Sequence, residues 1–398
     1  MKTQRGFTLV EIMVALVIGM IGVVIIMQVL ESAERQKRTT ATGTDAQVNG
    51  TIALYSLERD VRLAGYGLSS VKLLNCKVNA YNSARATALF SFQAAPVVIN
   101  PAGIPAGDTG TDVLQIAYGD SSGVVEGTPL GSLAAFPSYF MRDAVPGLAI
   151  NNFVVLSETG KKCALAQVTQ DPPLNSKTIF TDENQWNPAG GPGEAYTDAG
   201  YMFNAGIGPR VMLYAVRKGR LTQCDLLNSP CEDANRKDDG AVWLEIGPGI
   251  VGLTAAYGRD TRYPDDGVTP ALPARAVIPD KWDQTRPATA DATLAALVPG
   301  TSQAAPATGA CAWARIPAVS IALLARGAQY EAAEVTAEPP AFRVGSGQWS
   351  TACNGWTQVG DSCPFNMAGL TDWKHYRYKV FQTLVPLRNI LWMDKIGC

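Results

Sequence analysis

Hydrophobic side chains follow one another almost without interruption over residues 7–30, and this run is the clearest pattern in the chain. Its only clearly polar residues are Thr8, Glu11 and Gln28. As a helix at 1.5 Å per residue the run would be about 36 Å long, which exceeds the roughly 30 Å hydrocarbon core of a bilayer. Residues 7–30 are therefore predicted to form a membrane-spanning helix.

The polar stretch that follows keeps a helical period. One apolar stripe is formed by Leu54, Leu57, Val61 and Ala64. Glu58 and Arg62 add a favourable pair four residues apart on another face. No proline occurs before Pro96, and the Gly-Tyr-Gly sequence at 65–67 supplies the kind of stop that glycine gives. The helix is thus predicted to continue as an amphipathic segment over residues 31–67.

Beyond residue 67 the pattern changes to short β-rich runs bounded by Gly, Pro, Asp or Asn. Strands are predicted over residues 113–118, 153–156, 211–216, 242–246, 250–257, 318–324 and 376–386. A helix followed by strands favours an α+β fold with an antiparallel sheet packed on the helix. Residues 68–398 would form this globular β-rich head, and the Pro- and Ala-rich residues 260–309 are predicted to be a long surface insertion.

Charge and composition remove some classes of function. The chain has 33 basic and 35 acidic residues, so no basic field favours binding to nucleic acid. Gly (38) and Pro (25) are numerous, but apolar runs persist along the whole sequence. We therefore expect a loop-rich folded protein.

Eight cysteines, an even number, suit an oxidising compartment outside the cytoplasm. Eight cysteines allow 105 pairings, and the sequence favours two local ones, Cys224–Cys231 and Cys353–Cys363. Zinc is disfavoured, because the chain has one histidine and no C-x-x-C motif.

Catalytic chemistry has little support in the sequence. His375 is the only histidine, and no nucleophile elbow, HExxH motif or phosphate-binding loop occurs. Two acidic turns, Asp238-Asp239-Gly240 and Asp260 with Asp265 and Asp266, lack EF-hand spacing and are interpreted as solvated turns. We expect no catalytic residues, no metal and no cofactor, although calcium at these turns stays open.

Glu11 is the unusual residue of the predicted span. A charge at the centre of a spanning helix costs roughly 2.5–3.5 kcal/mol, so its carboxylate is expected to have a partner. A secretory signal peptide fits poorly, because the apolar run is too long and no small-residue cleavage site follows it. A plain single-pass anchor would explain the run but neither Glu11 nor the junction between Gly6 and Phe7.

At these residues the chain resembles the type IV pilin-like family. The matching positions are Gly6, Phe7, Thr8, Leu9, Glu11 and Ala15. In that family a prepilin peptidase removes a short basic leader ending in Gly and methylates the new amino terminus. The resemblance implies a leader over residues 1–6, cleavage between Gly6 and Phe7, N-methylation of Phe7, and pairing of Glu11 with the amino terminus of a neighbouring subunit.

Four further segments narrow the resemblance to PilW-type minor pilins, which are related to the J-type pseudopilins of type II secretion. These segments are residues 57–67, 255–260, 316–326 and 378–389. The third departs from the family pattern, because Pro317 and Ser320 stand where arginines are usual. The last segment is close to the closing strand of PilW-type proteins.

The resemblance implies a structural, non-enzymatic subunit with a pilin-like fold. It would sit in the inner membrane by one span, with its head in the periplasm, and later lie outside the cell at the pilus tip. Its implied partners are other minor pilins, the major pilin, the prepilin peptidase, the inner-membrane assembly machinery and a PilY-type tip adhesin. A bulky head suits the tip, because it would be hard to repeat along a packed shaft.

Two alternatives stay open. A J-type pseudopilin would share the fold but usually has a smaller head, so the size of this head and its closing strand favour a PilW-type minor pilin. A membrane-tethered periplasmic enzyme or binding module belongs to a different class of function.

Overall fold

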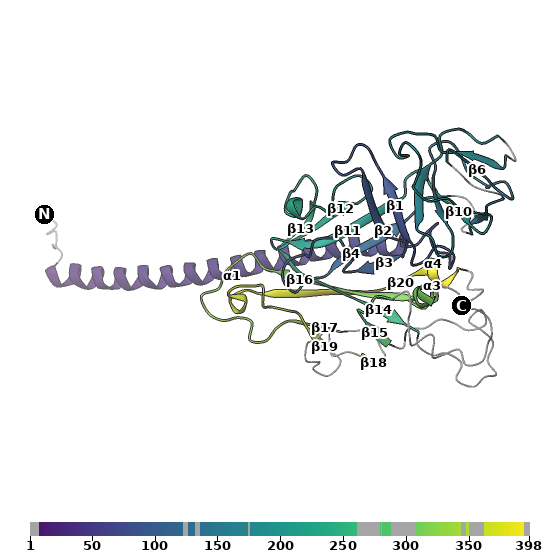
Figure 1. Cartoon of the computed structure of the whole chain (residues 1–398). Coiled ribbons are helices and arrows are strands. Elements are labelled where there is room, and N and C mark those ends of the chain that lie inside the picture. Colours follow the sequence, from purple (N-terminus) through teal and green to yellow (C-terminus); the bar gives the residue numbers. More distant parts are fainter. Residues whose placement is uncertain are drawn as a thin grey trace.

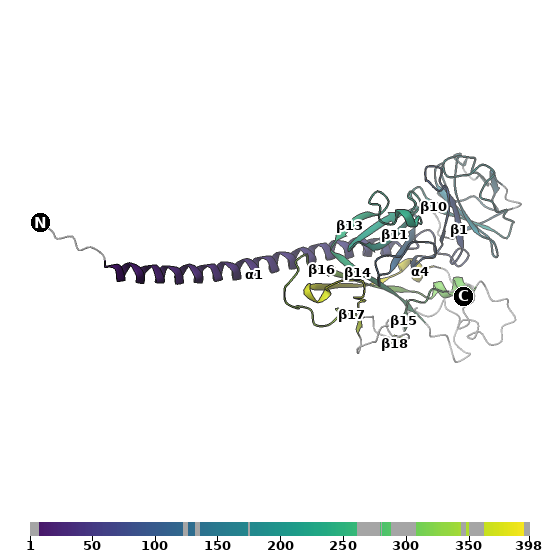
Figure 2. The same ribbon diagram turned by 60° about the vertical axis from the view of Figure 1, so that its left-hand side comes forward.

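A single long helix projects from a large head built mainly of β-strands (Figure 1). The computed structural model describes residues 8–121, 126–131, 136–173, 176–260, 279, 281–287, 308–343, 348–349 and 362–393. The first half of the helix is clear of the head in both views (Figures 1 and 2). One face of its second half packs on the head, with Ala53, Leu57 and Val61 buried, whereas Ile52 and Tyr55 stay exposed.

Helix α1 (Leu9–Leu63) is continuous over 55 residues, which confirms the predicted uninterrupted helix. Thr8 is its N-cap residue, and the predicted pair between Glu58 and Arg62 is formed. The helix ends at Leu63, before residue 67 where the predicted segment ends. The glycine stop begins at Gly65, whose φ of 79° lies in the left-handed region that favours glycine.

The strands form three main sheets instead of the one expected. The closing sheet contains, in spatial order, β18 (Gln348–Trp349), β15 (Lys281–Asp283), β14 (Ile250–Arg259), β16 (Ala318–Arg326) and β20 (Tyr378–Pro386). The middle sheet contains β13 (Leu244–Pro248), β12 (Arg220–Asp225), β11 (Arg210–Arg217), β4 (Val113–Tyr118) and β3 (Val97–Ile99). The outer sheet contains β2 (Leu89–Gln93), β1 (Lys77–Tyr81), β8 (Cys163–Gln167), β7 (Phe153–Ser157), β10 (Tyr201–Gly206) and β5 (Thr128–Pro129).

Most strand pairs are antiparallel, and β1/β8 and β15/β18 are parallel. Two small antiparallel pairs complete the strands, β6 (Ser138–Phe140) with β9 (Thr178–Phe180) and β17 (Ala341–Arg343) with β19 (Ser362–Pro364). Short helices complete the described elements: η1 (Ala234–Arg236), α3 (Thr308–Ala314), η4 (Trp373–His375) and α4 (Arg388–Leu391). Helix plus mainly antiparallel sheet confirms the α+β class.

The main core lies where α1 is held between the middle and closing sheets. Leu57 and Val61 of α1 are fully buried there, together with residues of β4, β11, β14, β16 and β20. Alternation along β11 shows why the layers stack: Tyr214 faces α1, whereas Leu213 faces the outer sheet. The head is therefore layered as outer sheet, middle sheet, α1 and closing sheet.

Six of the seven predicted strands are confirmed, as β4, β7, β11, β14, β16 and β20. The seventh starts later than predicted, at Leu244, because the N–H groups of Val242 and Trp243 both donate to the Asp239 carbonyl in a turn. Within the predicted surface insertion, β15 joins the closing sheet and buries Trp282. Most of residues 260–309 lie outside the described residues.

Two disulfides have both partners described. One joins Cys224 to Cys231, the local pair named from the sequence. The other joins Cys76, just before β1, to Cys163 at the start of β8, a pairing the sequence did not suggest. Cys363 is disulfide-bonded, but Cys353 lies outside the described residues, so Cys353–Cys363 stays a prediction.

Candidate functional site

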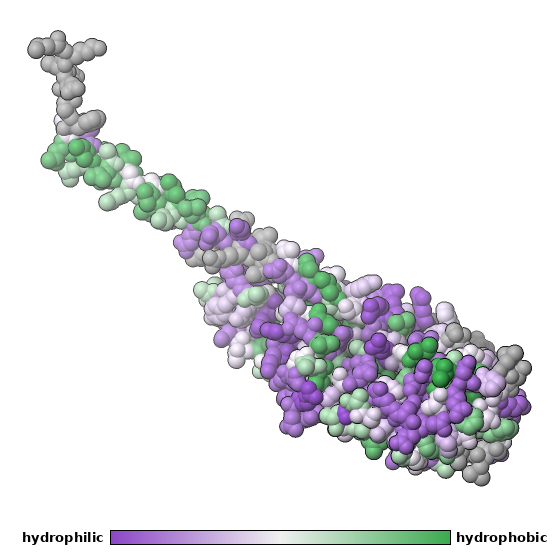
Figure 3. Space-filling view, turned by 90° about the horizontal axis from the view of Figure 1, so that it is seen from above, coloured by the Kyte–Doolittle hydropathy of each residue, from purple (hydrophilic) through white to green (hydrophobic). Residues whose placement is uncertain are grey.

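The exposed half of α1 is an apolar rod. Residues Leu9–Glu34 form an apolar segment of 26 residues, and its most apolar 18-residue stretch is not buried by the head. Figure 3 shows this rod as a hydrophobic stem on a head with a mixed, largely hydrophilic surface. By length and composition the segment can cross a bilayer, and it fits an inner-membrane anchor.

Glu11 lies in the first turn of this rod, with its side chain exposed. Its backbone N–H donates to the Thr8 hydroxyl oxygen at 3.3 Å, so the helix start is capped next to the carboxylate. Among the described residues, none forms an ion pair with Glu11. Gly6 and Phe7 lie outside the described residues. The carboxylate is thus presented at the helix start, where a partner charge from another molecule can reach it.

Glu11 shares one face of the helix with Ala15 and Gly19, which follow at intervals of four residues. A Cβ placed on Gly19 or on Gly22 would meet nothing within 4 Å. These glycines therefore serve no packing contact inside the chain. They leave a shallow strip on which another helix can approach closely.

The end of α1 is fastened to the head by polar contacts. The Asn389 side chain donates to the carbonyls of Leu63 (3.3 Å) and Ala64 (2.9 Å), which are left without helical partners at the C-terminus. The Gly65 N–H donates to the Ala117 carbonyl of β4 at 2.7 Å. Residues of the closing-strand region and of the middle sheet thus hold the same helix end.

A buried carboxylate in the last turn of α1, that of Asp60, joins the helix to the middle sheet. The Tyr214 hydroxyl donates to the Asp60 carboxylate at 2.5 Å, and Asp60 is 2 % exposed. Arg59 completes the group with an ion pair to Asp60 at 3.3 Å. Burial, with the nearby Asp60 charge, raises the pKa of Tyr214, so the phenol stays protonated and keeps donating.

The closing strand β20 is seated on the opposite side of the helix. The Phe381 ring lies against Gly50, so closely that any side chain at position 50 would overlap it. The Lys379 ammonium donates to the Gln47 side-chain oxygen at 2.8 Å. This part of the helix is therefore shaped to receive the segment that most resembles the PilW type.

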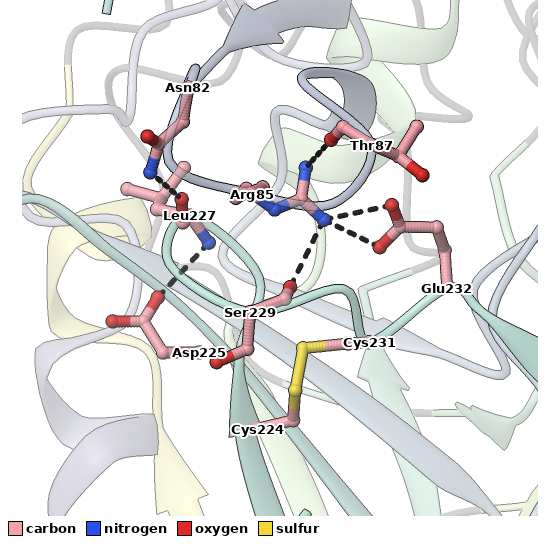
Figure 4. Close-up of polar contacts among 9 residues, drawn as sticks. All are labelled: Asn82, Arg85, Thr87, Cys224, Asp225, Leu227, Ser229, Cys231 and Glu232. Carbon is pink, nitrogen blue, oxygen red and sulfur yellow. Dashed lines mark hydrogen bonds and ion pairs between the residues drawn. A yellow bond between two sulfur atoms is a disulfide. The ribbon is translucent and has the colours of Figure 1, made fainter. Parts of the chain in front are cut away.

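A second fastened group joins the outer sheet to the loop closed by Cys224–Cys231 (Figure 4). The fully buried Arg85 side chain donates to Glu232 (2.7 Å) and to the carbonyls of Ser229 (3.0 Å) and Thr87 (3.2 Å). Burial lowers the pKa of the Arg85 guanidinium, and the Glu232 charge opposes that effect. Nothing in the sequence except the spacing of the two cysteines pointed to this group.

Other residues that the sequence analysis named, His375 and Asp239, make contacts with neighbouring residues of the chain. The His375 ring lies 2.8 Å from the Glu331 carbonyl through its Nδ1 and stacks on Tyr330. Asp239 accepts hydrogen bonds from Arg236 and from the Ala241 N–H. Asp265 and Asp266 lie outside the described residues, so calcium at that turn is untested.

Two family models match the chain. Residues 1–27 match the prokaryotic N-terminal methylation motif, and residues 214–389 match the type IV pilus-assembly protein W family. No curated protein and no solved structure matches. The second match runs from β11 to α4 and so contains the whole described closing sheet, whereas the described outer sheet lies between the two matches. The chain is a PilW-type member of the type IV pilin-like family, a minor pilin of type IV pilus assembly.

Proposed function

We propose that this minor pilin primes pilus assembly as part of a complex of minor pilins that ends at the pilus tip, where it supports a PilY-type adhesin. The observation that carries the proposal is the division of α1 into an exposed apolar half and a half clamped between two sheets. Such a helix can leave the bilayer and enter a helical bundle without any change in the head.

The position at the tip is supported by the bulk of the head. Three sheets surround or extend from the clamped helix, and the outer sheet adds a layer beyond the family match. A subunit within a shaft has neighbours above and below it, whereas a terminal subunit is free of neighbours on one side. A head of this size is accommodated most easily at the end.

In the proposed sequence of events, a prepilin peptidase cuts between Gly6 and Phe7 and methylates the Phe7 amine. The head then lies in the periplasm, with the span in the inner membrane. Assembly brings Glu11 to the amino terminus of a neighbouring subunit. Pairing with that amine recovers much of the cost of a carboxylate in an apolar bundle.

The proposed partners are other minor pilins and the major pilin, together with the inner-membrane assembly machinery. A structural role follows from this assignment. The pseudopilin alternative predicts a different partner set, the type II secretion apparatus.

A deletion strain tests the proposal. We expect loss of surface pili and of twitching motility, with secretion of exoproteins unchanged, and full recovery when the gene is restored. Blocked exoprotein release with normal pili would instead support the pseudopilin. Intact pili and intact secretion would contradict both and leave the tethered binding module or enzyme.

A further inference from the structure

Strand β2 is an edge strand with unused backbone groups. It ends the outer sheet and pairs with β1. The Asn82 N–H donates to the Ala88 carbonyl and the Ala94 N–H to the Cys76 carbonyl, so the even-numbered residues of β2 are bonded to β1. By the alternation of an antiparallel pair, the backbone groups of Leu89 and Ser91 point away from it.

The outward edge of β2 has few internal partners. The Gln93 carbonyl accepts from the Gln115 side chain at 2.9 Å. Within the described part of the chain, no strand pairs with the outward groups of Leu89 and Ser91. An exposed edge of this kind is a template for another strand.

A cleft of about 850 Å³ lies beside this edge, between β2 and the edge strand β3 of the middle sheet. Its lining is mixed. Apolar side chains come from Phe90, Phe92, Val98, Ile104 and Leu226, and polar ones from Asn75, Gln93 and Gln115. Leu89 stands at the rim and is 67 % exposed.

The charged side chains of the cleft that have no ion-pair partner in the described part of the chain are positive. Three charged side chains line it, Lys77, Glu232 and Arg286. Glu232 is engaged by the buried Arg85. Within the described residues neither Lys77 nor Arg286 forms an ion pair, and both are exposed. The cleft therefore favours an acidic ligand.

We propose that an extended acidic segment of another protein binds here by adding a strand to the outer edge of β2. Main-chain hydrogen bonds to Leu89 and Ser91 would provide the pairing, alternate side chains would enter the cleft, and Lys77 and Arg286 would attract acidic residues. The inference goes beyond the proposed function, because it does not depend on when or where the chain acts in assembly.

The site is held ready before any partner arrives. Thr87 and Glu232 line the cleft and both belong to the Arg85 group shown in Figure 4. The Cys224–Cys231 disulfide closes the loop that carries Ser229, another acceptor of Arg85. Because these contacts already hold this side of the cleft in place, less conformational entropy is lost when a ligand binds.

Photo-crosslinking in piliated cells tests the proposal. A benzophenone amino acid is placed at Leu89 of the full-length chain, and the crosslinked segment of the partner is identified by mass spectrometry. We combine it with Ser91→Pro, which removes an outward N–H without touching a bond to β1, and with the matched control Ser91→Ala, which keeps that N–H. Arg286→Glu reverses one charge at an exposed position and guards against a folding defect in the proline variant.

We expect a crosslink to an acidic segment of another protein, with a yield about tenfold lower in Ser91→Pro and in Arg286→Glu and unchanged in Ser91→Ala. The unfolding midpoint of the purified full chain in detergent should be the same for all variants. The proposal would be overturned by a crosslink only within the chain or to a second copy, or by the absence of any crosslink. It would also be overturned if the crosslinked segment has no net negative charge, or if Arg286→Glu leaves the crosslinking yield unchanged.

Discussion

Glu11 is a single carboxylate whose effect should appear in assembly and not in the fold of the head. It is exposed in the first turn of α1, far along the rod from the buried core. We expect Glu11→Gln, which removes the charge and keeps the shape, to reduce surface pili at least tenfold. The unfolding midpoint of the full chain in detergent should not change.

Gln28→Ala is the matched control for Glu11, because it alters the other strongly polar residue of the apolar run over residues 7–30. This variant should assemble pili normally. Piliation is measured by shearing the pili from the cells and quantifying them. Equal piliation of Glu11→Gln and wild type would contradict the proposed pairing of Glu11 with a neighbouring amine.

Asp112 shows how a residue can make stability depend on pH. Its buried carboxylate accepts hydrogen bonds from Asn100 (2.8 Å), from Thr254 and the Ala255 N–H (3.0 Å each), and from Gln284 (2.6 Å). Burial raises the pKa of Asp112, and these hydrogen bonds oppose the rise. The native state therefore holds the proton more tightly than the unfolded state.

Because the pKa of Asp112 is higher in the native state, its contribution to the free energy of unfolding should be largest at low pH. That contribution should fall as pH rises from about 4 towards the raised native pKa. Asp112→Asn keeps the shape but cannot titrate. In urea unfolding between pH 4 and 7, we expect the wild type to lose stability relative to Asp112→Asn as pH increases. A difference that is constant, or that grows in the opposite direction, would contradict the assignment.

At the scale of elements, the contact between α1 and β20 depends on one glycine. Gly50→Ala would force the new methyl group into the Phe381 ring. We expect this change to lower the free energy of unfolding by about 1–3 kcal/mol, as overpacked positions do. Chemical denaturation of the full chain in detergent measures it.

Gly43→Ala is the control, since a Cβ there meets nothing within 4 Å. In an exposed helix interior it should stabilise by up to about 1 kcal/mol. Combining Gly50→Ala with Phe381→Leu should restore part of the loss. If Gly50 and Gly43 respond alike, the helix and closing strand are not packed as described.

The sequence predicted the elements that follow a strong local rule. The helix end follows from Gly65, and β4, β11 and β16 are long apolar runs because both faces of these strands are buried. Strands β1 and β2 were not predicted, because each has only five residues and one largely polar face. Their assignment depends on partners, and β1 pairs in parallel with a strand more than 80 residues away.

At the scale of the whole molecule, the two described disulfides should differ in their contribution to stability. Cys76–Cys163 spans a sequence separation of 87 residues, and Cys224–Cys231 spans 7. If loop closure in the unfolded chain dominates, the first contributes about 4–5 kcal/mol and the second about 2 kcal/mol. Double Cys→Ala variants of each pair, compared by urea unfolding, check this order; a larger loss from the short loop would contradict it.

The candidate sites differ in how far the sequence predicted them. The apolar helix that carries Glu11 could be predicted from the sequence, because the motif and the apolar run are contiguous in the chain. Cleavage after Gly6, methylation of Phe7 and pairing of Glu11 stay predictions. The cleft beside β2 could not be, because its lining comes from residues between Asn75 and Pro287 that only the folded head brings together. The Arg85 group was missed for the same reason, since Arg85 and Glu232 are 147 residues apart.

The clamped half of α1 has a mechanical consequence. In Figure 1, β16 and β20 run alongside the helix, and both strands contact it. Tension applied along a filament would therefore pull the helix lengthwise past its neighbours. Such loading shears many contacts together, including those of Asp60, Gly50 and Gln47. A force on the exposed half of α1 would be distributed over all the contacts between its second half and the two sheets. The head of a subunit that is retracted under force would therefore resist separation from the helix.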